Sequence, residues 1–143
     1  MKKLAIFMVL TTLFMFALAP QVRANNVCSV ADLKGDYSFV VSGTLNESSG
    51  LPAGPFAAAG KTTYHGDGIA DGVIQISLNG KQISSNWSAT YAADSSNCTF
   101  TKAITLDVGG TLHFFITVGD DFRELRFVGT DTGTAITGTA RKQ

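Results

Sequence analysis

The sequence contains little of what most catalytic, metal and nucleic-acid sites are built from. It has two histidines, two cysteines and one tryptophan, and charged residues make up only 15% of it. Two cysteines with no histidine nearby make a poor zinc site. The motifs G-x-S-x-G, H-E-x-x-H and C-x-x-C and a phosphate-binding loop do not occur. We therefore expect no metal, no cofactor and no enzyme of these classes, and an enzyme of any class is not the favoured interpretation.

The N-terminus has the pattern of a secretory signal peptide. Lys2 and Lys3 precede an almost unbroken apolar run, Leu4 to Ala19, and Ala24 supplies the small residue that cleavage requires. The run is shorter than the roughly 20 residues that span a membrane, which disfavours the alternative of a retained anchor. The sequence predicts that residues 1–24 are removed on export.

The mature chain, residues 25–143, is predicted to be one domain that acts in the periplasm or outside the cell, with no membrane insertion. Three of the eleven basic residues (Lys2, Lys3 and Arg23) leave with the signal peptide, so eight remain against eleven acidic residues. Nucleic acids and anionic membrane surfaces select basic patches. We therefore expect no nucleic-acid partner.

Both cysteines, Cys28 and Cys98, lie in the mature part of the chain. In an exported protein two thiols favour a disulfide, although two free thiols or a metal-binding pair are the alternatives. A loop of this length would make the bond worth about 3–4 kcal/mol in loop-closure entropy.

Glycine-, asparagine- and aspartate-rich turns divide the mature chain into short segments that alternate or are rich in β-branched and aromatic residues, which is typical of an all-β sandwich or barrel. Asn79-Gly80 is a strong hairpin signal. No window has a convincing helical repeat, apart from a single turn near residues 30–34. The expected strands are 35–44, 56–64, 69–78, 82–92, a fifth that Cys98 opens and that contains Phe100, Ile104 and Leu106, then 112–118, 122–129 and 134–141.

Eight strands joined by short turns predict an antiparallel up-and-down β-barrel, because closure removes both exposed edges. In such a meander the first and fifth strands begin at the same end, which brings Cys28 and Cys98 together. Residues 28–34 would then cross that opening and be pinned there. A Greek-key β-sandwich is the competing architecture.

Gly35-Asp36-Tyr37 opens the first expected strand after a short N-terminal turn. It resembles the G-x-W start of the calycin superfamily, the lipocalins and their relatives, with Tyr37 in place of tryptophan. In that superfamily the aromatic residue closes the barrel bottom and a late basic residue packs over it, a position that Arg141 would take. The layout is similar to that of allene oxide cyclase and dirigent barrels, and the chain also resembles small exported bacterial proteins of unassigned role. The resemblance implies a calycin-like barrel sized for one ligand.

Few polar residues are candidates for chemistry. His65 is interpreted as a solvated turn residue, and His113 is expected to point outward with Phe114 inward. Asp67 and Asp71 lie in a glycine-rich segment that supplies too few oxygen ligands for calcium. We therefore predict no metal site.

The remaining signal is an aromatic interior, which in an eight-stranded barrel is either filled or holds one small ligand. The first hypothesis is therefore a binding protein for a small apolar or aromatic molecule. The residues predicted to contact that ligand are Tyr37, Phe39, Trp87, Tyr91, Phe100 and Phe127.

Two other functions compete with ligand binding. A structural or interaction protein with a filled barrel would explain why Val40, Val73 and one of Phe114 and Phe115 must face outward, and it predicts a homo-oligomer. A cofactor-free isomerase or cyclase would need polar groups in the interior, for which the candidates are Tyr91, Glu124 and Arg126.

Overall fold

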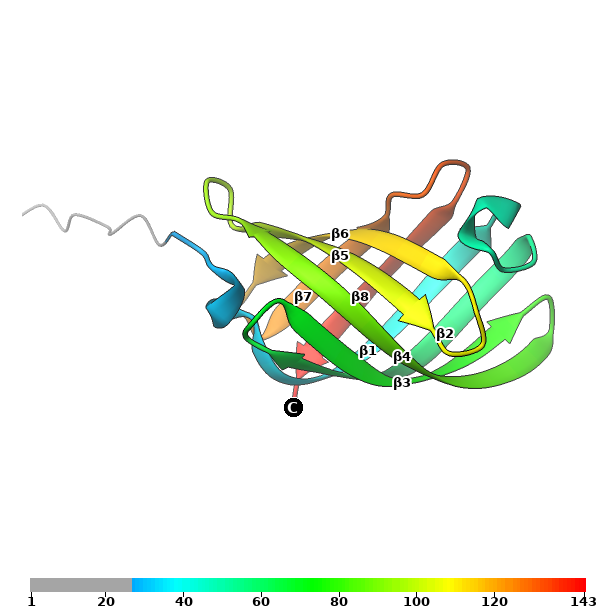
Figure 1. Ribbon diagram of the computed structural model, residues 1–143, viewed down its shortest axis with the longest axis horizontal. Coiled ribbons are helices and arrows are strands. Elements are labelled where there is room, and N and C mark those ends of the chain that lie inside the picture. Colours follow the sequence, from blue (N-terminus) through cyan, green and yellow to red (C-terminus); the bar gives the residue numbers. More distant parts are fainter. Residues whose placement is uncertain (1–26) are drawn as a thin grey trace, which may run out of the picture.

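The structure, a computed structural model, describes residues 27–143, so the predicted signal peptide lies outside the described residues. The described chain is a closed antiparallel barrel whose eight strands follow one another in chain order (Figure 1). The strands are β1 (Lys34–Leu45), β2 (Gly54–His65), β3 (Ile69–Leu78), β4 (Lys81–Asp94), β5 (Thr99–Leu106), β6 (Thr111–Gly119), β7 (Glu124–Gly129) and β8 (Ala135–Lys142).

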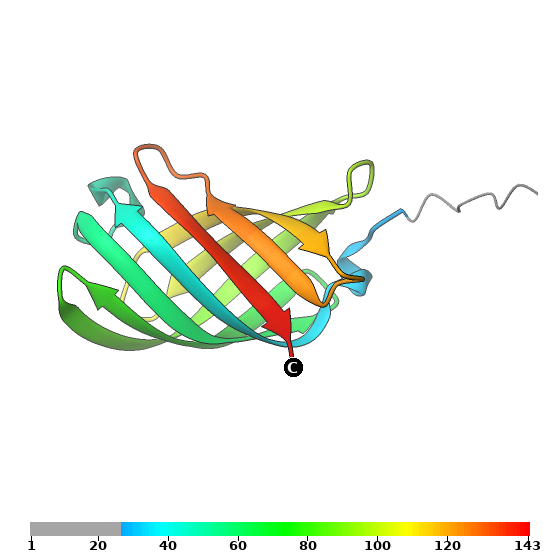
Figure 2. The ribbon, with the colours of Figure 1, turned by 180° about the vertical axis from the view of Figure 1, so that it is seen from behind.

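Pairing between the first and last strands closes the barrel. β1 and β8 run antiparallel from Tyr37 opposite Lys142 to Thr44 opposite Ala135. Figure 2 shows β8 lying between β7 and β1, so that the sheet has no free edge. The predicted up-and-down barrel is confirmed, and the alternative Greek-key sandwich is excluded by this strand order.

The interior is built by the strict alternation of each strand. In β2, for example, Phe56, Ala58, Thr62 and Tyr64 are buried, while the alternate residues point outward and are largely exposed. Successive side chains of a strand point to opposite faces, and a closed sheet has one inner face. The most completely buried large side chains are Tyr37, Phe100, Leu33, Leu45, Ile76, Ile116, Leu125 and Ile136.

One end of the barrel is sealed by the N-terminal segment, at the left in Figure 1. This plug comprises the 3₁₀ helix η1 (Val30–Asp32) and Leu33, whose side chain is fully buried. The disulfide Cys28–Cys98 fixes it, with the two Cα atoms 5.0 Å apart. The Tyr91 hydroxyl also donates to the Leu33 carbonyl oxygen at 2.9 Å. The predicted disulfide and the predicted crossing segment are both confirmed.

The opposite end is covered by the loop between β1 and β2. This loop carries a second 3₁₀ helix, η2 (Glu47–Ser49), and places Leu51 in the core. Side-chain amides anchor it: Asn46 donates to the Thr132 carbonyl at 2.6 Å and Asn79 to the Ala53 carbonyl at 2.8 Å. Neither helical segment of the described chain has the length and apolar character of a membrane span.

The start of the seventh strand differs from the prediction. It was expected at residue 122, but β7 begins at Glu124 because Asp120, Asp121 and Phe122 have left-handed backbones with φ of 49°, 50° and 64°. The coiled turn places the Phe122 carbonyl where the Tyr37 hydroxyl donates to it at 2.6 Å. The Phe122 ring packs against Phe100 across the plugged end.

We expect the paired change Cys28→Ser and Cys98→Ser to lower the free energy of unfolding by about 4 kcal/mol, because the disulfide closes a loop of sequence separation 70. Urea unfolding followed by Trp87 emission measures it. The change Ser84→Ala on the exposed face of β4 serves as a control and should leave the midpoint unchanged. A midpoint equal to that of the unaltered protein would show that the bridge does not stabilise the plug.

Candidate functional site

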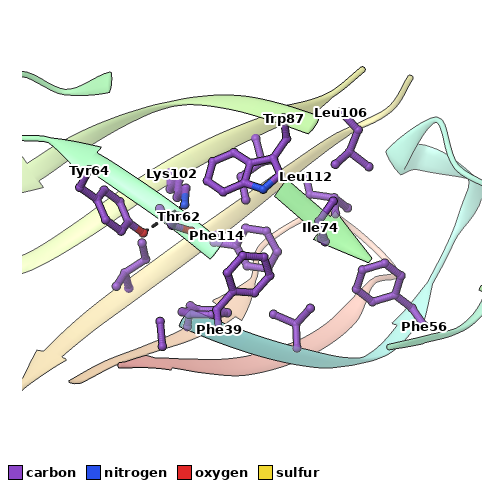
Figure 3. Close-up of a pocket in the computed structure, with 15 residues that line it drawn as sticks. Phe39, Phe56, Thr62, Tyr64, Ile74, Trp87, Lys102, Leu106, Leu112 and Phe114 are labelled. Atoms are coloured by element: carbon purple, nitrogen blue, oxygen red, sulfur yellow. Dashed lines mark hydrogen bonds between the residues drawn. The ribbon is translucent and has the colours of Figure 1, made fainter. Parts of the chain in front are cut away.

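A cavity of about 40 Å³ lies in the middle of the barrel, between the plug and the opposite end. Its wall is formed mainly by aromatic and aliphatic side chains from all eight strands, and Figure 3 shows them converging on one space. The lining residues are Phe39, Val41, Phe56, Thr62, Tyr64, Ile74, Trp87, Lys102, Ile104, Leu106, Leu112, Phe114, Ile116, Phe127 and Ala140.

Three aromatic rings of this wall each cover a glycine directly opposite on the neighbouring strand. The pairs are Phe39 with Gly60, Trp87 with Gly72, and Phe127 with Gly138. A Cβ atom added at these glycines would lie 2.8, 2.7 and 2.5 Å, respectively, from the facing ring. Glycine thus lets each ring lie against the barrel wall, a packing known from other sheets, and this leaves space at the centre.

Lys102 is the unexpected member of the wall. It lies on β5 with only 6% of its surface exposed, and its Nζ donates a hydrogen bond to the Tyr64 hydroxyl at 3.1 Å. The Nζ also lies 4.3 Å from the centre of the Trp87 ring and 4.6 Å from that of Tyr64. Figure 3 shows the amine between these two rings, facing the apolar wall.

The amine has no counter-ion in the described part of the chain. None of the ion pairs among residues 27–143 includes Lys102. Tyr64 does not supply a phenolate, because burial first, and then the neighbouring Tyr37 and Tyr91, raise the pKa of its hydroxyl above the usual range. Burial lowers the pKa of Lys102 to about 7, since an ammonium ion loses its hydration there. The neutral amine is therefore well populated at neutral pH.

The Trp87 indole provides a second polar group. Its Nε1 is buried and finds no hydrogen-bond partner among residues 27–143, and the side chain is 3% exposed. Buried N–H groups are normally hydrogen-bonded, because an unpaired one costs about 1–3 kcal/mol. An acceptor atom inside the cavity would satisfy this donor.

The six residues predicted to contact a ligand fall into two groups. Phe39, Trp87 and Phe127 line the cavity. The other three, Tyr37, Tyr91 and Phe100, are buried toward the plug and are not part of its wall. These three residues have structural contacts instead. Both tyrosine hydroxyls donate hydrogen bonds to backbone carbonyl oxygens, and the Phe100 ring packs against Tyr91 and Phe122.

The polar residues considered for an isomerase lie elsewhere. Glu124 and Arg126 pair with each other at 2.7 Å on the outer face of β7, and Arg141 lies 3.8 Å from Glu124. Arg141 therefore does not cover Tyr37 as the calycin resemblance implied. Lys142 is the basic residue near that ring, with its Nζ 5.8 Å from the ring centre.

Both histidines lie on the surface, as predicted, and each pairs with an aspartate. The predicted turn position of His65 is wrong, because His65 is the last residue of β2 and pairs with Lys34 of β1. The ring nitrogen distances are 2.6 Å from His65 to Asp71 and 2.7 Å from His113 to Asp131. Within residues 27–143, no group of three or more His, Cys, Asp or Glu side chains is placed to hold a metal.

The outward apolar residues also lie where alternation placed them. Val40 is 58% exposed and Val73 is 52% exposed, and Phe115 points outward while Phe114 is buried.

Lys102 was missed by the sequence analysis, although a signal for it exists. Phe100, Ile104 and Leu106 were assigned to one face of the fifth strand, and Lys102 has the same parity. The alternation of β5 therefore places its side chain inside, among the other inward residues.

No family model matches the chain, and no match is found among curated proteins or among solved structures. The fold is a closed eight-stranded antiparallel barrel, a fold that does not by itself determine a function. The residues of the interior are therefore the basis for inferring one.

The buried amine makes a prediction about stability and pH. Between about pH 7 and pH 10 the unfolded chain carries an ammonium at position 102 and the folded chain a neutral amine, so the unfolded state binds more protons. The free energy of unfolding should therefore rise with pH by about 1 kcal/mol per unit in this window. Above it the buried tyrosines Tyr37 and Tyr64, whose pKa values are raised, should reverse the trend.

Urea unfolding of Lys102→Met across this range measures the effect. We expect the free energy of unfolding of this variant not to increase between pH 7 and pH 10. Below pH 7 the variant should be more stable than the unaltered protein. Lys61→Met, which removes an exposed lysine from β2, should keep the increase in the free energy of unfolding with pH. Parallel curves of this free energy against pH for Lys102→Met and the unaltered protein would show that Lys102 does not cause the increase.

The ring-over-glycine packing makes a second prediction. We expect Gly138→Ala to destabilise the barrel by about 1–3 kcal/mol, because the new methyl group meets the Val40 carbonyl oxygen and the Phe127 ring. The matched control is Gly129→Ala on β7, where the nearest atom to the new carbon would be 3.4 Å away. Thermal unfolding of both variants should show a clear loss for Gly138→Ala alone, and equal melting temperatures would refute the packing argument.

Proposed function

We propose that this protein binds a small, mainly apolar molecule carrying one hydrogen-bond-accepting oxygen, inside the barrel. The observation that supports the proposal is a central cavity whose wall is apolar except for a few groups, including a buried amine and an indole N–H without a partner in the described chain. Ligand sites typically have this composition, in which apolar walls supply affinity and a few polar groups fix orientation.

The polar groups indicate what the ligand carries. Lys102 uses one of its donor hydrogens on Tyr64, and the Trp87 N–H is a donor only. Both would favour an acceptor such as a carbonyl, ether or hydroxyl oxygen.

The size of the cavity limits the size of the ligand. A cavity of about 150 Å³ takes up benzene, whereas the volume here is about 40 Å³. In the same proportion, the barrel as it stands has room for about two heavy atoms, so a ligand of four or five heavy atoms requires side chains of the wall to move. Phe39 and Phe127 are only partly buried although they point inward. Because these two rings are less tightly enclosed than most of the wall, they are the ones that we expect to turn for such a ligand.

The two ends of the barrel differ in how they are held. The plug is tied by the covalent bridge Cys28–Cys98 and by Tyr91. The loop between β1 and β2, residues 46–53, is held by hydrogen bonds of Asn46 and Asn79. We propose that the ligand enters under this loop, because hydrogen bonds open more readily than a disulfide.

We further propose that the protein acts in the periplasm or outside the cell. The disulfide supports this, because such bonds persist in oxidising compartments. The signal-peptide pattern of residues 1–24 supports it independently.

The single tryptophan gives a direct assay, since Trp87 is part of the cavity wall. We expect butan-1-ol to change its emission in a saturable way. Ala140→Ile should fill the cavity and weaken this binding at least about tenfold, which is about 1.4 kcal/mol.

Thr139→Ile is the matched control, because Thr139 is the exposed neighbour on the same strand. It should bind like the unaltered protein. If emission responds in none of the three proteins, or equally in all three, the barrel is a filled structural unit and the proposal fails.

A further inference from the structure

The amine of Lys102 stands out among the titratable groups of the described chain. It is enclosed by the barrel, it faces the cavity, and its hydrogen-bond partner is the hydroxyl of a tyrosine rather than a carboxylate. A lysine held only to close a core would bring a desolvation cost that an apolar residue of similar size avoids.

We propose that Lys102 forms a reversible imine with a small apolar aldehyde that enters the barrel cavity. This inference rests on the proposed function and names the chemical class of its ligand. It is carried by the position of Nζ on the cavity wall, by the Tyr64 hydroxyl 3.1 Å away and by the apolar surroundings of both.

The reaction requires an unprotonated amine, since only its lone pair is nucleophilic. Burial lowers the pKa of Lys102 to about 7, which supplies this form at neutral pH. Lysines that are desolvated in apolar pockets are activated as Schiff-base nucleophiles for the same reason.

The atoms balance without an oxidant or a reductant. The Nζ lone pair adds to the aldehyde carbon, the carbonyl π electrons move to oxygen, and one proton passes from nitrogen to that oxygen, which gives a neutral carbinolamine. The hydroxyl group then leaves with the second nitrogen proton as water while the C=N bond forms. The starting amine and the imine are both neutral, which suits an apolar cavity.

Tyr64 is placed to carry the proton between nitrogen and oxygen. Its hydroxyl accepts from Nζ, and its own hydrogen is free to be donated to the carbinolamine oxygen. Because its pKa is raised, it stays a phenol and acts as a relay rather than as a counter-ion. The Trp87 N–H, which lacks a partner in the described chain, offers a second donor on the same wall.

The first experiment traps the imine. The purified protein is incubated at pH 7 with propanal and cyanoborohydride, which reduces an imine to a stable secondary amine. We expect intact-mass spectrometry to show the mass of one propyl group at low conversion, and peptide mapping to place it on Lys102. Lys102→Met should lose this fast modification, while Lys61→Met, lacking an exposed lysine on β2, should keep it.

Two further readouts separate a reactive amine from a merely buried one. The rate of labelling of Lys102 should rise between about pH 6 and pH 8. The rate for Nα-acetyl-lysine in solution should rise at higher pH, because its side-chain amine has a pKa of about 10.4. Tyr64→Phe keeps the ring that packs on Tyr37 and Tyr91, and should slow labelling of Lys102 at least about tenfold.

The outcomes distinguish this inference from the proposed function. If butan-1-ol changes Trp87 emission but propanal modifies only other amines, the barrel binds ligands and the imine is refuted. The imine is also refuted if propanoate binds and Lys102 stays unmodified, since the amine then recognises an anion. If neither butan-1-ol nor propanoate changes Trp87 emission and Lys102 stays unmodified, both the proposed function and the imine are refuted. Because peptide mapping uses the unaltered protein, the test does not depend on the folding of any variant.

Discussion

The pairing of β1 with β8 is the constraint on which the rest of the structure depends. It gives the sheet an inside, and only then does alternation along each strand sort the side chains into a core and a surface. The up-and-down order of the strands places the starts of β1 and β5 at one end, and there the bridge between Cys28 and Cys98 ties the plug across the opening that closure creates. The cavity is what remains between this plug and the loop that covers the other end.

The barrel departs from a filled core in two ways that act together. An eight-stranded barrel is just wide enough for its own side chains to fill it. Here glycines under Phe39, Trp87 and Phe127 let three large rings lie against the wall instead of meeting at the centre. Lys102 occupies an inward position that an aliphatic residue would fill at lower cost, and burial lowers the pKa of its amine to about 7. Space and a buried amine are thus present in the same place.

The sequence was sufficient to predict the barrel and the disulfide, because turn residues mark the strand ends and a meander fixes which ends meet. It was not sufficient for the site. Parity tells which face of a strand a residue occupies but not its height in the barrel, so Tyr37 and Tyr91 near the plug could not be separated from Phe39 beside the cavity. The position of Lys102 in its strand indicates an inward side chain, whereas its residue type argues against one, because lysines are almost never fully buried. The rings over glycines depend on the register of neighbouring strands, which the sequence alone does not define.

The central claim is that a neutral amine faces an apolar cavity inside this barrel. A pH titration of the lysine side chains by ¹³C and ¹⁵N NMR, with Lys102→Met to assign the resonance, tests it most directly. The account predicts one lysine with a midpoint at about pH 7 whose resonance shifts when a small ligand is added. A Lys102 midpoint near that of a free lysine side chain, about 10.4, would show that the amine is solvated and would contradict the account.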